Sequence, residues 1–447
     1  METLPLQQGA PLRHTNYEQS KRALLDLAAE RGYLDARLTR SELLVDLERY
    51  TATAVLHLES GARYRFGAVR FEQGFFDPDF LARFVPFKPG DPYSTSGLLQ
   101  LQTGLSNTEY FKQVDVRPRR DLVQDLVVPV DVTLKLREPN KYTVGIGFGT
   151  DTGARAKFGW ERRLINPTGD RFLAALDVSQ VRSTADVRYL IPVFDPRTDH
   201  VALGASLHDD EATSFTSKRS VLGVGLSHTR RSWRELLSLN YQRERFTAGS
   251  DSGVATLLMP GAGWTYVHAD NRLQPRHGGR LQLEVRGANE HVGSDLSFWQ
   301  LHLGGKYIVP VGSGARIITR ADAGHIATPN FRKLPASLRF YTGGSQSVRG
   351  YPYQGLAAVD EAGLTIGGSN LLVGSIELEQ RVWQAWSAAV FYDTGKAFND
   401  SSEPFNDGAG VGLRWRLPVG LLQLDVAQAL TRESKPWRVH FLIGAEL

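Results

Sequence analysis

The sequence contains no cysteine. A chain without thiols has no disulfide framework, no thiolate metal site and no cysteine nucleophile, while its redox compartment stays undecided. It also lacks any apolar run as long as a membrane-spanning helix requires. Because only helices and closed barrels pair all their backbone groups inside a bilayer, a membrane form of this chain has to be a β-barrel.

Long runs of charge of one sign are absent as well. The formal net charge of +4 and the pI near 9.1 are mild for 447 residues, and no basic stretch is long enough to indicate nucleic-acid binding. The 11 histidines are scattered without the spacing of metal ligands. The segment GIGFG at 145–149 imitates a dinucleotide-binding motif, but no helix follows it. We therefore expect no metal and no cofactor.

Glycine and aromatic residues, in contrast, are abundant. The 44 glycines, 8 Trp and 15 Tyr are typical of a protein with many twisted strands and aromatic-rich borders. From residue 141 onward, apolar and polar residues alternate over segments of about ten residues, which is the pattern of transmembrane barrel strands. In the segment 142–149, four apolar side chains share one face, opposite Thr143 and the glycines Gly145, Gly147 and Gly149. The apolar face would meet lipid and the other face a wet lumen.

Residues 1–138 have a different organisation, because helical patterns occur there. Residues 61–138 predict a complete small domain with the order strand, helix, helix, strand, strand. Residues 1–60 show the last three elements of the same order, and so predict a partial copy of the same module. Two unrelated α+β domains are the alternative. The elements expected in the complete domain are 63–71, a short helix opened by Asp77 and Pro78, 94–111, 114–121 and 128–138.

Counting the alternating segments predicts sixteen strands in residues 139–447. An even number is what antiparallel bacterial barrels require, and it returns the C-terminus to the side of the N-terminal domains. The predicted fold class is therefore a transmembrane antiparallel β-barrel preceded by α+β domains. The predicted strands are 141–150, 154–164, 170–181, 184–193, 199–209, 217–229, 233–246, 254–268, 279–290, 295–309, 314–326, 371–383, 385–398, 406–417, 420–430 and 436–447.

The longest interruption in this series is the loop 327–370, whose length indicates that it is either functional or disordered. It carries GGSQSVRGYPY at 343–353, where an Arg between Val and Gly predicts a tight turn that presents one guanidinium at a chosen place. Alternation puts Glu377 and Asp393 on the inner faces of the next two strands. We therefore expect the loop to fold back inside the barrel and Arg349 to meet carboxylates. A solvated loop with an incidental Arg is the alternative.

These features together resemble a known family. Modules of this order, followed by a sixteen-stranded barrel whose sixth outer loop carries VRGY, are similar to the POTRA-bearing outer-membrane assembly and secretion superfamily. Within it, the segments 142–172, 337–356 and 437–447 resemble the TamA family, the outer-membrane subunits of the translocation and assembly module. TamA proteins usually carry more POTRA domains than this chain has, so incomplete periplasmic contacts are expected.

The resemblance implies a lock between the loop and the barrel wall. In the superfamily the loop Arg reaches acidic residues on the inner wall, and here it maps onto Glu377 and onto the YDTG motif at 392–395. The resemblance and the alternation of side chains thus point to the same two carboxylates. The residues expected in the lock are Val348, Arg349, Gly350, Tyr351, Glu377, Asp393 and Gly395.

The resemblance also implies a lateral seam, because the family opens its barrel between the first and last strands. Glycines lack side chains to pack and weaken a strand, which gives a soft seam a physical basis. Close packing of these glycines against a plug is the alternative. The residues expected at the seam are Gly145, Gly147, Gly149, His440, Leu442 and Gly444.

The function implied by the resemblance is insertion or translocation of client β-barrel proteins, autotransporters above all, in the outer membrane of a Gram-negative bacterium. The implied partner is TamB, the inner-membrane-anchored periplasmic subunit, and a share in lipid transport is a second possibility. This function makes and breaks no covalent bond, so we expect that the protein is not an enzyme. The alternatives are a polypeptide pore of the two-partner secretion kind, a general barrel-assembly subunit with more POTRA domains, and a passive porin, which would have no use for residues 1–138.

Overall fold

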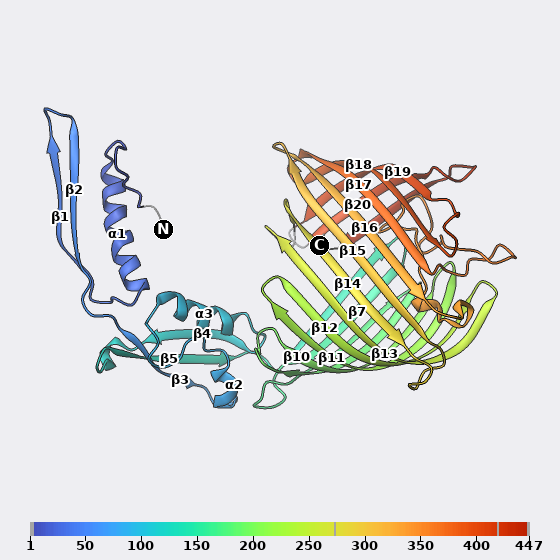
Figure 1. The fold of residues 1–447 in the computed structure, drawn as a ribbon, viewed down its shortest axis with the longest axis horizontal. Helices are drawn as coiled ribbons and strands as arrows, with labels where there is room; N and C mark the ends of the chain where they lie inside the picture. Colours follow the sequence, from blue (N-terminus) through green and yellow to red (C-terminus); the bar gives the residue numbers. More distant parts are fainter. Residues whose placement is uncertain (1–3, 272–273, 418–419, 445–447) are drawn as a thin grey trace. The chain divides into compact units, whose positions relative to one another are not determined.

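The computed structural model describes residues 4–271, 274–417 and 420–444. The chain forms two compact units, whose elements are labelled in Figure 1. The first unit comprises Met1–Pro139 together with two short turns, Asn166–Gly169 and Phe194–Arg197. The second unit contains the remaining residues to Leu447. No helix among the described residues is both long enough and apolar enough to cross a membrane.

The first unit begins with helix α1 (His14–Glu30) and an antiparallel hairpin of β1 (Arg37–Asp46) and β2 (Thr51–Glu59). The helix buries Tyr17, Ser20 and Ala28, and the Ser20 hydroxyl accepts a hydrogen bond from Leu6 N–H at 2.9 Å. This sheet has two strands only, and most of their side chains are exposed. The predicted order of one helix and two strands is therefore present.

The rest of the first unit consists of β3 (Arg65–Glu72), α2 (Pro78–Ala82), α3 (Thr95–Ser106), β4 (Phe111–Pro118) and β5 (Val127–Leu136). The sheet order is β3-β5-β4, with β3 parallel and β4 antiparallel to the central strand. Alternate residues of β5 are buried, as are three leucines of α3. The buried residues are Val128, Val130, Val132, Leu134, Leu98, Leu101 and Leu105.

The prediction that the second helix of this domain reaches residue 111 is wrong. Helix α3 ends at Ser106, where the Thr108 hydroxyl donates to the Leu105 carbonyl at 2.7 Å and closes the last turn. Phe111 instead begins β4 and is buried. The start of the helix follows the sequence, since the Ser94 hydroxyl caps it by accepting from Gly97 N–H at 3.0 Å.

The second unit is one sheet of sixteen strands in sequence order from β6 to β21, each antiparallel to the next. The predicted strand number and order are confirmed, and Figure 1 shows the tilted, curved strands. The strands are β6 (Asn140–Gly149), β7 (Gly153–Arg162), β8 (Arg171–Ser179), β9 (Arg182–Pro192), β10 (His200–Glu211), β11 (Phe215–Arg230), β12 (Trp233–Ala248), β13 (Asp251–Ala269), β14 (Gly278–Ala288), β15 (Phe298–Val311), β16 (Ala315–Ala327), β17 (Asn370–Trp383), β18 (Trp386–Phe398), β19 (Asn406–Leu417), β20 (Gly420–Ala429) and β21 (Trp437–Gly444).

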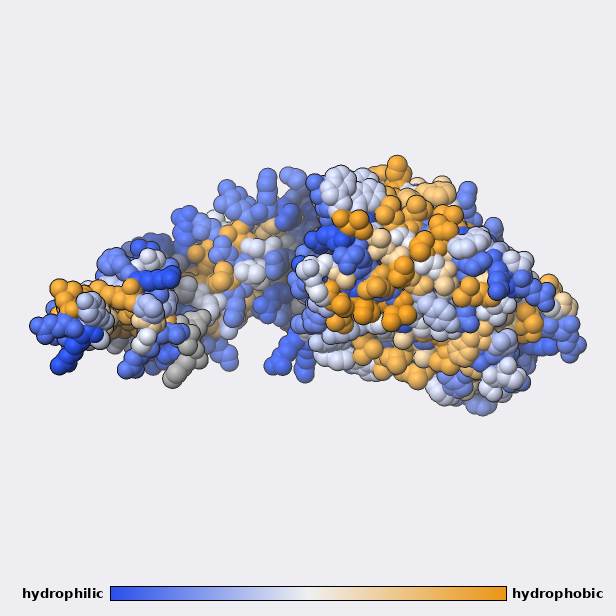
Figure 2. Space-filling model, turned by 90° about the horizontal axis from the view of Figure 1, so that it is seen from above, coloured by the Kyte–Doolittle hydropathy of each residue, from blue (hydrophilic) through white to orange (hydrophobic). Residues whose placement is uncertain are grey.

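The two faces of this sheet differ in polarity. In β17 the apolar residues Leu372, Ile376 and Leu378 are exposed on the outside, while Glu377 and Glu379, which alternate with them, are buried on the inside. The same alternation recurs around the sheet, and Figure 2 shows the outward apolar side chains as orange patches over the barrel. An apolar exterior around a polar interior is the arrangement of a barrel that stands in lipid.

The loop between β16 and β17 folds into the barrel and contains two short 3-10 turns, Phe331–Lys333 and Ala336–Leu338. It builds an apolar core inside the barrel by packing on the walls of β13 and β15, and many of its side chains are buried, charged Arg349 included. The loop therefore packs against the inner wall of the barrel, and the Arg349 side chain is withdrawn from solvent. The core residues contributed by the loop are Leu334, Leu338 and Phe340.

Candidate functional site in the barrel lumen

The Arg349 guanidinium is fully buried and lies between three carboxylates. It binds Asp393 in a bidentate manner, with Nε and Nη2 at 2.7 and 2.8 Å from the two carboxylate oxygens. Nη1 donates to Glu377 at 2.7 Å and to Asp425 at 3.2 Å. Planar, charge-assisted contacts of this kind specify both position and orientation of the Arg. The structure thus brings together Arg349, Glu377 and Asp393, which the sequence had pointed to.

The sequence analysis did not identify Asp425 or Arg414, which belong to the same cluster. The Arg414 guanidinium of β19 bonds Glu377 at 2.7 Å and Asp425 at 2.5 Å, and Arg320 of β16 lies 3.7 Å from Asp393. Three cations therefore face three carboxylates. The sequence signal for Asp425 and Arg414 was their position on the lumen-facing side of their strands. Alternation of side chains does not show which lumen-facing residues lie at the same height in the barrel.

The backbone around Arg349 fits the wall because two positions lack a side chain. Gly350 has φ of +96°, a left-handed conformation that favours glycine. Opposite it, a Cβ atom at Gly408 of β19 would lie 2.0 Å from the Arg349 carbonyl oxygen. The guanidinium also stacks on Phe391, with 3.3 Å between its carbon and the ring centroid. Glycine at 408 therefore allows the loop to lie directly on the strand.

The remaining residues of the loop motif anchor the same turn. Val348 and Tyr351 are fully buried and pack together with Leu356 of the loop and Ala429 of β20. The Tyr351 hydroxyl donates to the Asp407 carbonyl at 3.1 Å. Gly395 of β18 lies under Val348, since a Cβ atom there would be 2.9 Å from a Val348 methyl group. Every residue expected in the lock is thus in contact with the loop motif or part of it.

The first and last strands of the sheet do not form a ladder in the described residues. There, β6 pairs only with β7, and β21 pairs only with β20. The bonds between the two edges are Thr150 N–H to the Phe441 carbonyl at 3.3 Å, Phe441 N–H to Thr150 Oγ1 at 3.1 Å and a bond from Arg155 to the Ile443 carbonyl at 3.0 Å. The barrel is therefore nearly closed, with a weakly bonded seam.

The residues expected at the seam lie along these two edges. Leu442 and Gly444 pair with Gln423 and Leu421 of β20. A Cβ atom at Gly145 would meet only Lys157, at 3.8 Å, and the three atoms nearest to one at Gly147 all belong to Arg155. The alternative that these two glycines pack against a plug is therefore not what the structure has, because their neighbours come from β7.

The loop and the seam are directly connected. Ser345 N–H of the loop donates to Asp151, in the turn after β6, at 2.7 Å. Gly350 N–H donates to His440 Nε2 of β21 at 3.0 Å, and the other ring nitrogen of His440 lies 3.5 Å from Asp151. One stretch of the loop, 345–350, therefore contacts both edges of the seam.

A second cluster, which the sequence analysis missed, holds the first half of the loop to β12 and β13. Buried Arg339 donates to Asp251 at 2.8 Å and to the Ile366 carbonyl at 2.7 Å. Buried Glu244 accepts from Ser337 N–H at 3.1 Å and from the Ser337 hydroxyl at 2.5 Å. This second anchor therefore joins the loop to a part of the wall formed by strands other than those that hold Arg349.

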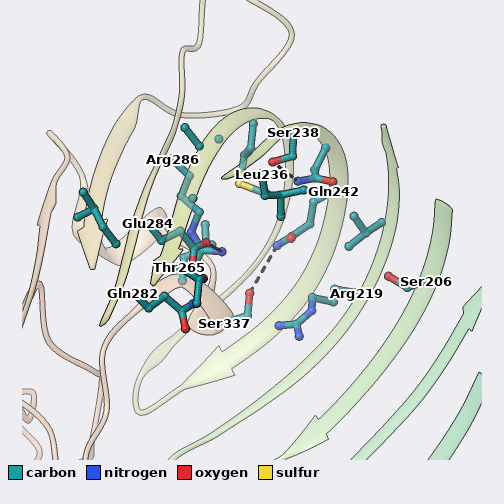
Figure 3. Close-up of a pocket in the computed structure, with 18 of the residues that line it drawn as sticks. Ser206, Arg219, Leu236, Ser238, Gln242, Thr265, Gln282, Glu284, Arg286 and Ser337 are labelled. Carbon is teal, nitrogen blue, oxygen red and sulfur yellow. Dashed lines mark hydrogen bonds and ion pairs between the residues drawn. The ribbon is translucent and has the colours of Figure 1, made fainter. Parts of the chain in front are cut away.

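Beside the second anchor lies a polar cavity of about 500 Å³, lined by inward-facing residues of β10 to β14 and by two loop residues. Figure 3 shows Ser337 reaching Gln242 at its border, between Arg219 and Arg286. Both arginines lie near carboxylates, since Arg219 is 3.5 Å from Asp210 and Arg286 is 3.7 Å from Glu284. Within the described residues no group of side chains could hold a metal ion.

Asp251→Asn is expected to loosen the first half of the loop without unfolding the barrel. The amide keeps the shape but loses the charge-assisted bond to Arg339, an interaction worth about 1.5–3 kcal/mol. The rate of protease cleavage within 327–370 measures this loosening, and it should rise. Asp186→Asn is the matched control, because Asp186 pairs along its own strand with Arg188 at 2.7 Å. Equal cleavage rates in the two variants would contradict the role of the anchor.

A sixteen-stranded antiparallel barrel with an apolar exterior, a charged lumen and an α+β domain ahead of it defines a β-barrel protein of the outer membrane. Residues 165–446 match the Omp85 superfamily domain, and residues 64–138 match the POTRA model described as surface antigen variable number repeat. The chain belongs to the Omp85 superfamily and carries a POTRA domain.

The chain is also similar to individual proteins. The chain is 22% identical over 462 residues to outer membrane protein assembly factor BamA of Neorickettsia risticii (strain Illinois), a match that covers 96% of this chain and 61% of the relative. The chain therefore spans less than two thirds of that protein's length. Its fold resembles BamA from Haemophilus ducreyi lacking POTRA domains 1-3, with a TM-score of 0.82 at 17% identity over 97% of this chain and 94% of the other. CdiB from Acinetobacter baumannii has a TM-score of 0.56 at 15% identity, covering 96% and 81%.

Proposed function

We propose that this protein inserts client β-barrel proteins, such as autotransporters, into the outer membrane of a Gram-negative bacterium through the seam between β6 and β21. The observation that carries the proposal is the pair of strand edges, whose described residues have few bonds between them. An unpaired edge presents a row of N–H and C=O groups and is a template for another strand. In this proposal the protein acts by offering this edge for hydrogen bonding. No covalent bond is made or broken, so the protein is not an enzyme.

The side chains of β6 support this role. Its outward residues Val144 and Ile146 are 76% and 91% exposed, more than the Leu176 and Val178 of β8, at 47% and 43%. Its inward positions 145 and 147 are glycines, which add no packing across the seam. The strand at the edge therefore has little that holds a neighbour in place, which suits exchange of one neighbouring strand for another.

The lock supports a mechanism in which the loop and the seam move together. Residues 345–350 hold both edges, through Asp151 on one side and His440 on the other. With Arg349 seated, these contacts keep the edges near each other. Displacement of the loop motif removes these two bonds. The direct contacts between the described parts of the two edges remain, namely those of Thr150, Phe441 and Arg155 and the approach of His440 to Asp151 at 3.5 Å.

The finer assignment that we propose is to the TamA family. Its support is the resemblance of the segments 142–172, 337–356 and 437–447 to TamA. The partner is then TamB, an inner-membrane-anchored protein of the periplasm, and lipid transport to the outer membrane is a second activity of the same module. The N-terminal domains lie in the periplasm in this proposal, with residues 61–138 as the complete POTRA domain and residues 1–60 as a partial one.

A disulfide across the seam is expected to stop client insertion. Thr150→Cys and Phe441→Cys suit this test, because the backbone bond at 3.3 Å places the two residues side by side. A disulfide needs Cα atoms about 4.4–6.8 Å apart, so neighbouring positions are scanned for the pair that oxidises most completely. Since the chain has no other cysteine, oxidation affects this pair alone. Membrane insertion of an autotransporter is measured with the pair oxidised and reduced.

The matched control carries Val144→Cys and Phe158→Cys, which are ladder partners in β6 and β7. A disulfide there joins strands that stay together, so insertion should continue after oxidation. Reduction should restore insertion in the seam variant. If the oxidised seam variant inserts its client normally while a secreted polypeptide crosses the lumen, the protein is a polypeptide pore of the two-partner secretion kind, and the proposed function is wrong.

A further inference from the structure

Arg155 of β7 reaches across β6 to the far edge of the seam. Its Nη2 donates to the carbonyl oxygen of Ile443 in β21 at 3.0 Å, although β6 lies between the two strands. Among the described residues this carbonyl is the one polar partner of the guanidinium. A side chain from the second strand therefore bonds the backbone of the last strand.

The path of Arg155 depends on Gly147, its ladder partner in β6. A Cβ atom at Gly147 would lie 2.7 Å from Nε and 3.2 Å from Cγ of Arg155, so any other residue there would displace the guanidinium. Gly145, on the same face of the same strand, is different, because a Cβ atom there would meet only Lys157 Cβ, at 3.8 Å. Both positions lack a side chain, but only the space at Gly147 is used by Arg155 where it crosses β6.

We propose that Arg155, lying over Gly147, is a clasp that holds whichever strand lies against the edge of β6. The clasp bonds a backbone carbonyl, a group that every strand presents, so it does not depend on the sequence of the neighbour. In the closed seam the neighbour is β21. In the open seam the same donors face the backbone of an incoming client strand, a step that rests on the proposed function. Arg155 is thus a positioning residue for strand exchange.

The clasp is tested by measuring hydrogen exchange of the backbone amides at the seam. The sample is the full chain reconstituted in lipid vesicles. Arg155→Ala should make the amides of Thr150 and Phe441 exchange about tenfold faster, the factor that corresponds to loss of about 1.4 kcal/mol from one charge-assisted bond. The amides of β14 and β15, paired on both sides, should keep their rates. Equal acceleration throughout the barrel would overturn the clasp, because it would indicate a general loss of stability.

The two glycines provide a matched pair of variants. Gly147→Ala should accelerate seam exchange as Arg155→Ala does, since the methyl group displaces the flexible end of Arg155 and leaves the backbone in place. Gly145→Ala and Lys157→Ala should leave the seam rates unchanged. Adding Arg155→Ala to Gly147→Ala should give no further acceleration, because both changes remove the same bond. Unchanged seam exchange in Arg155→Ala, or equal acceleration in Gly145→Ala and Gly147→Ala, would overturn the clasp.

This outcome is independent of the cysteine experiment. If Arg155→Ala leaves seam exchange unchanged while the seam disulfide still stops insertion, the clasp is wrong and the proposed function stands. If Arg155→Ala accelerates exchange while the disulfide has no effect on insertion, the clasp holds the barrel closed and the proposed function is wrong.

Discussion

Replacing Arg349 with alanine is expected to release the loop from the wall and to destabilise the barrel by about 3–5 kcal/mol, the usual consequence of removing one partner from a buried ion pair. Asp393 suffers most, because it loses the bidentate guanidinium and, among the described side chains, keeps Arg320 at 3.7 Å as its cationic neighbour. Glu377 and Asp425 retain Arg414. The temperature at which the folded band converts to the unfolded band on a semi-native gel measures the loss, and cleavage of the loop by protease measures its release.

Arg332→Ala is the matched control, since this Arg lies on the same loop with a largely exposed side chain. Its conversion temperature should stay close to that of the unchanged protein. A second variant separates lost bonding from uncompensated charge. Adding Asp393→Asn to Arg349→Ala removes the carboxylate left without its main partner, so part of the stability should return. If Arg349→Ala and Arg332→Ala behave alike, the ion cluster does not hold the loop.

Gly408→Ala is expected to displace the loop motif without removing any charge. The new methyl group would lie 2.0 Å from the Arg349 carbonyl oxygen, a backbone atom that cannot rotate away, so the loop or β19 must shift. Overpacking of this kind typically costs about 1–3 kcal/mol. We expect faster cleavage within 327–370 and a seam that exchanges hydrogen faster, because the contacts of residues 345–350 with both edges move with the motif.

The control for the glycine is Gly374→Ala in β17. A Cβ atom there has one neighbour within 4 Å, a Thr394 methyl group at 3.7 Å, which is an ordinary contact. This variant should match the unchanged protein in loop cleavage and seam exchange. A Gly408→Ala protein with an intact loop would show that the close approach at 408 is not required for docking.

The number and order of the barrel strands could be predicted from the sequence because side-chain alternation is a local property. Every strand of the barrel exposes its residues alternately to lipid and to the lumen, so each strand can be recognised from its own segment of sequence. The same parity placed Glu377 and Asp393 on the inner wall, and the loop motif supplied the Arg. Helix α3 shows the limit of this local view. The end of this helix depends on a single turn at Thr108, and the spacing of apolar residues does not predict that turn.

Only the tertiary structure decides which lumen-facing side chains contact one another inside the barrel. The alternation of side chains shows at most that Asp425, Arg414 and Glu244 face the lumen, and Asp251 lies outside the predicted strand 254–268. The height of each residue in the barrel depends on the stagger of sixteen strands and on the path of a long loop. The seam is the clearest case, because Arg155 and Ile443 are 288 positions apart. Their bond requires the sheet to curve until its first and last strands meet, and no local pattern encodes that closure.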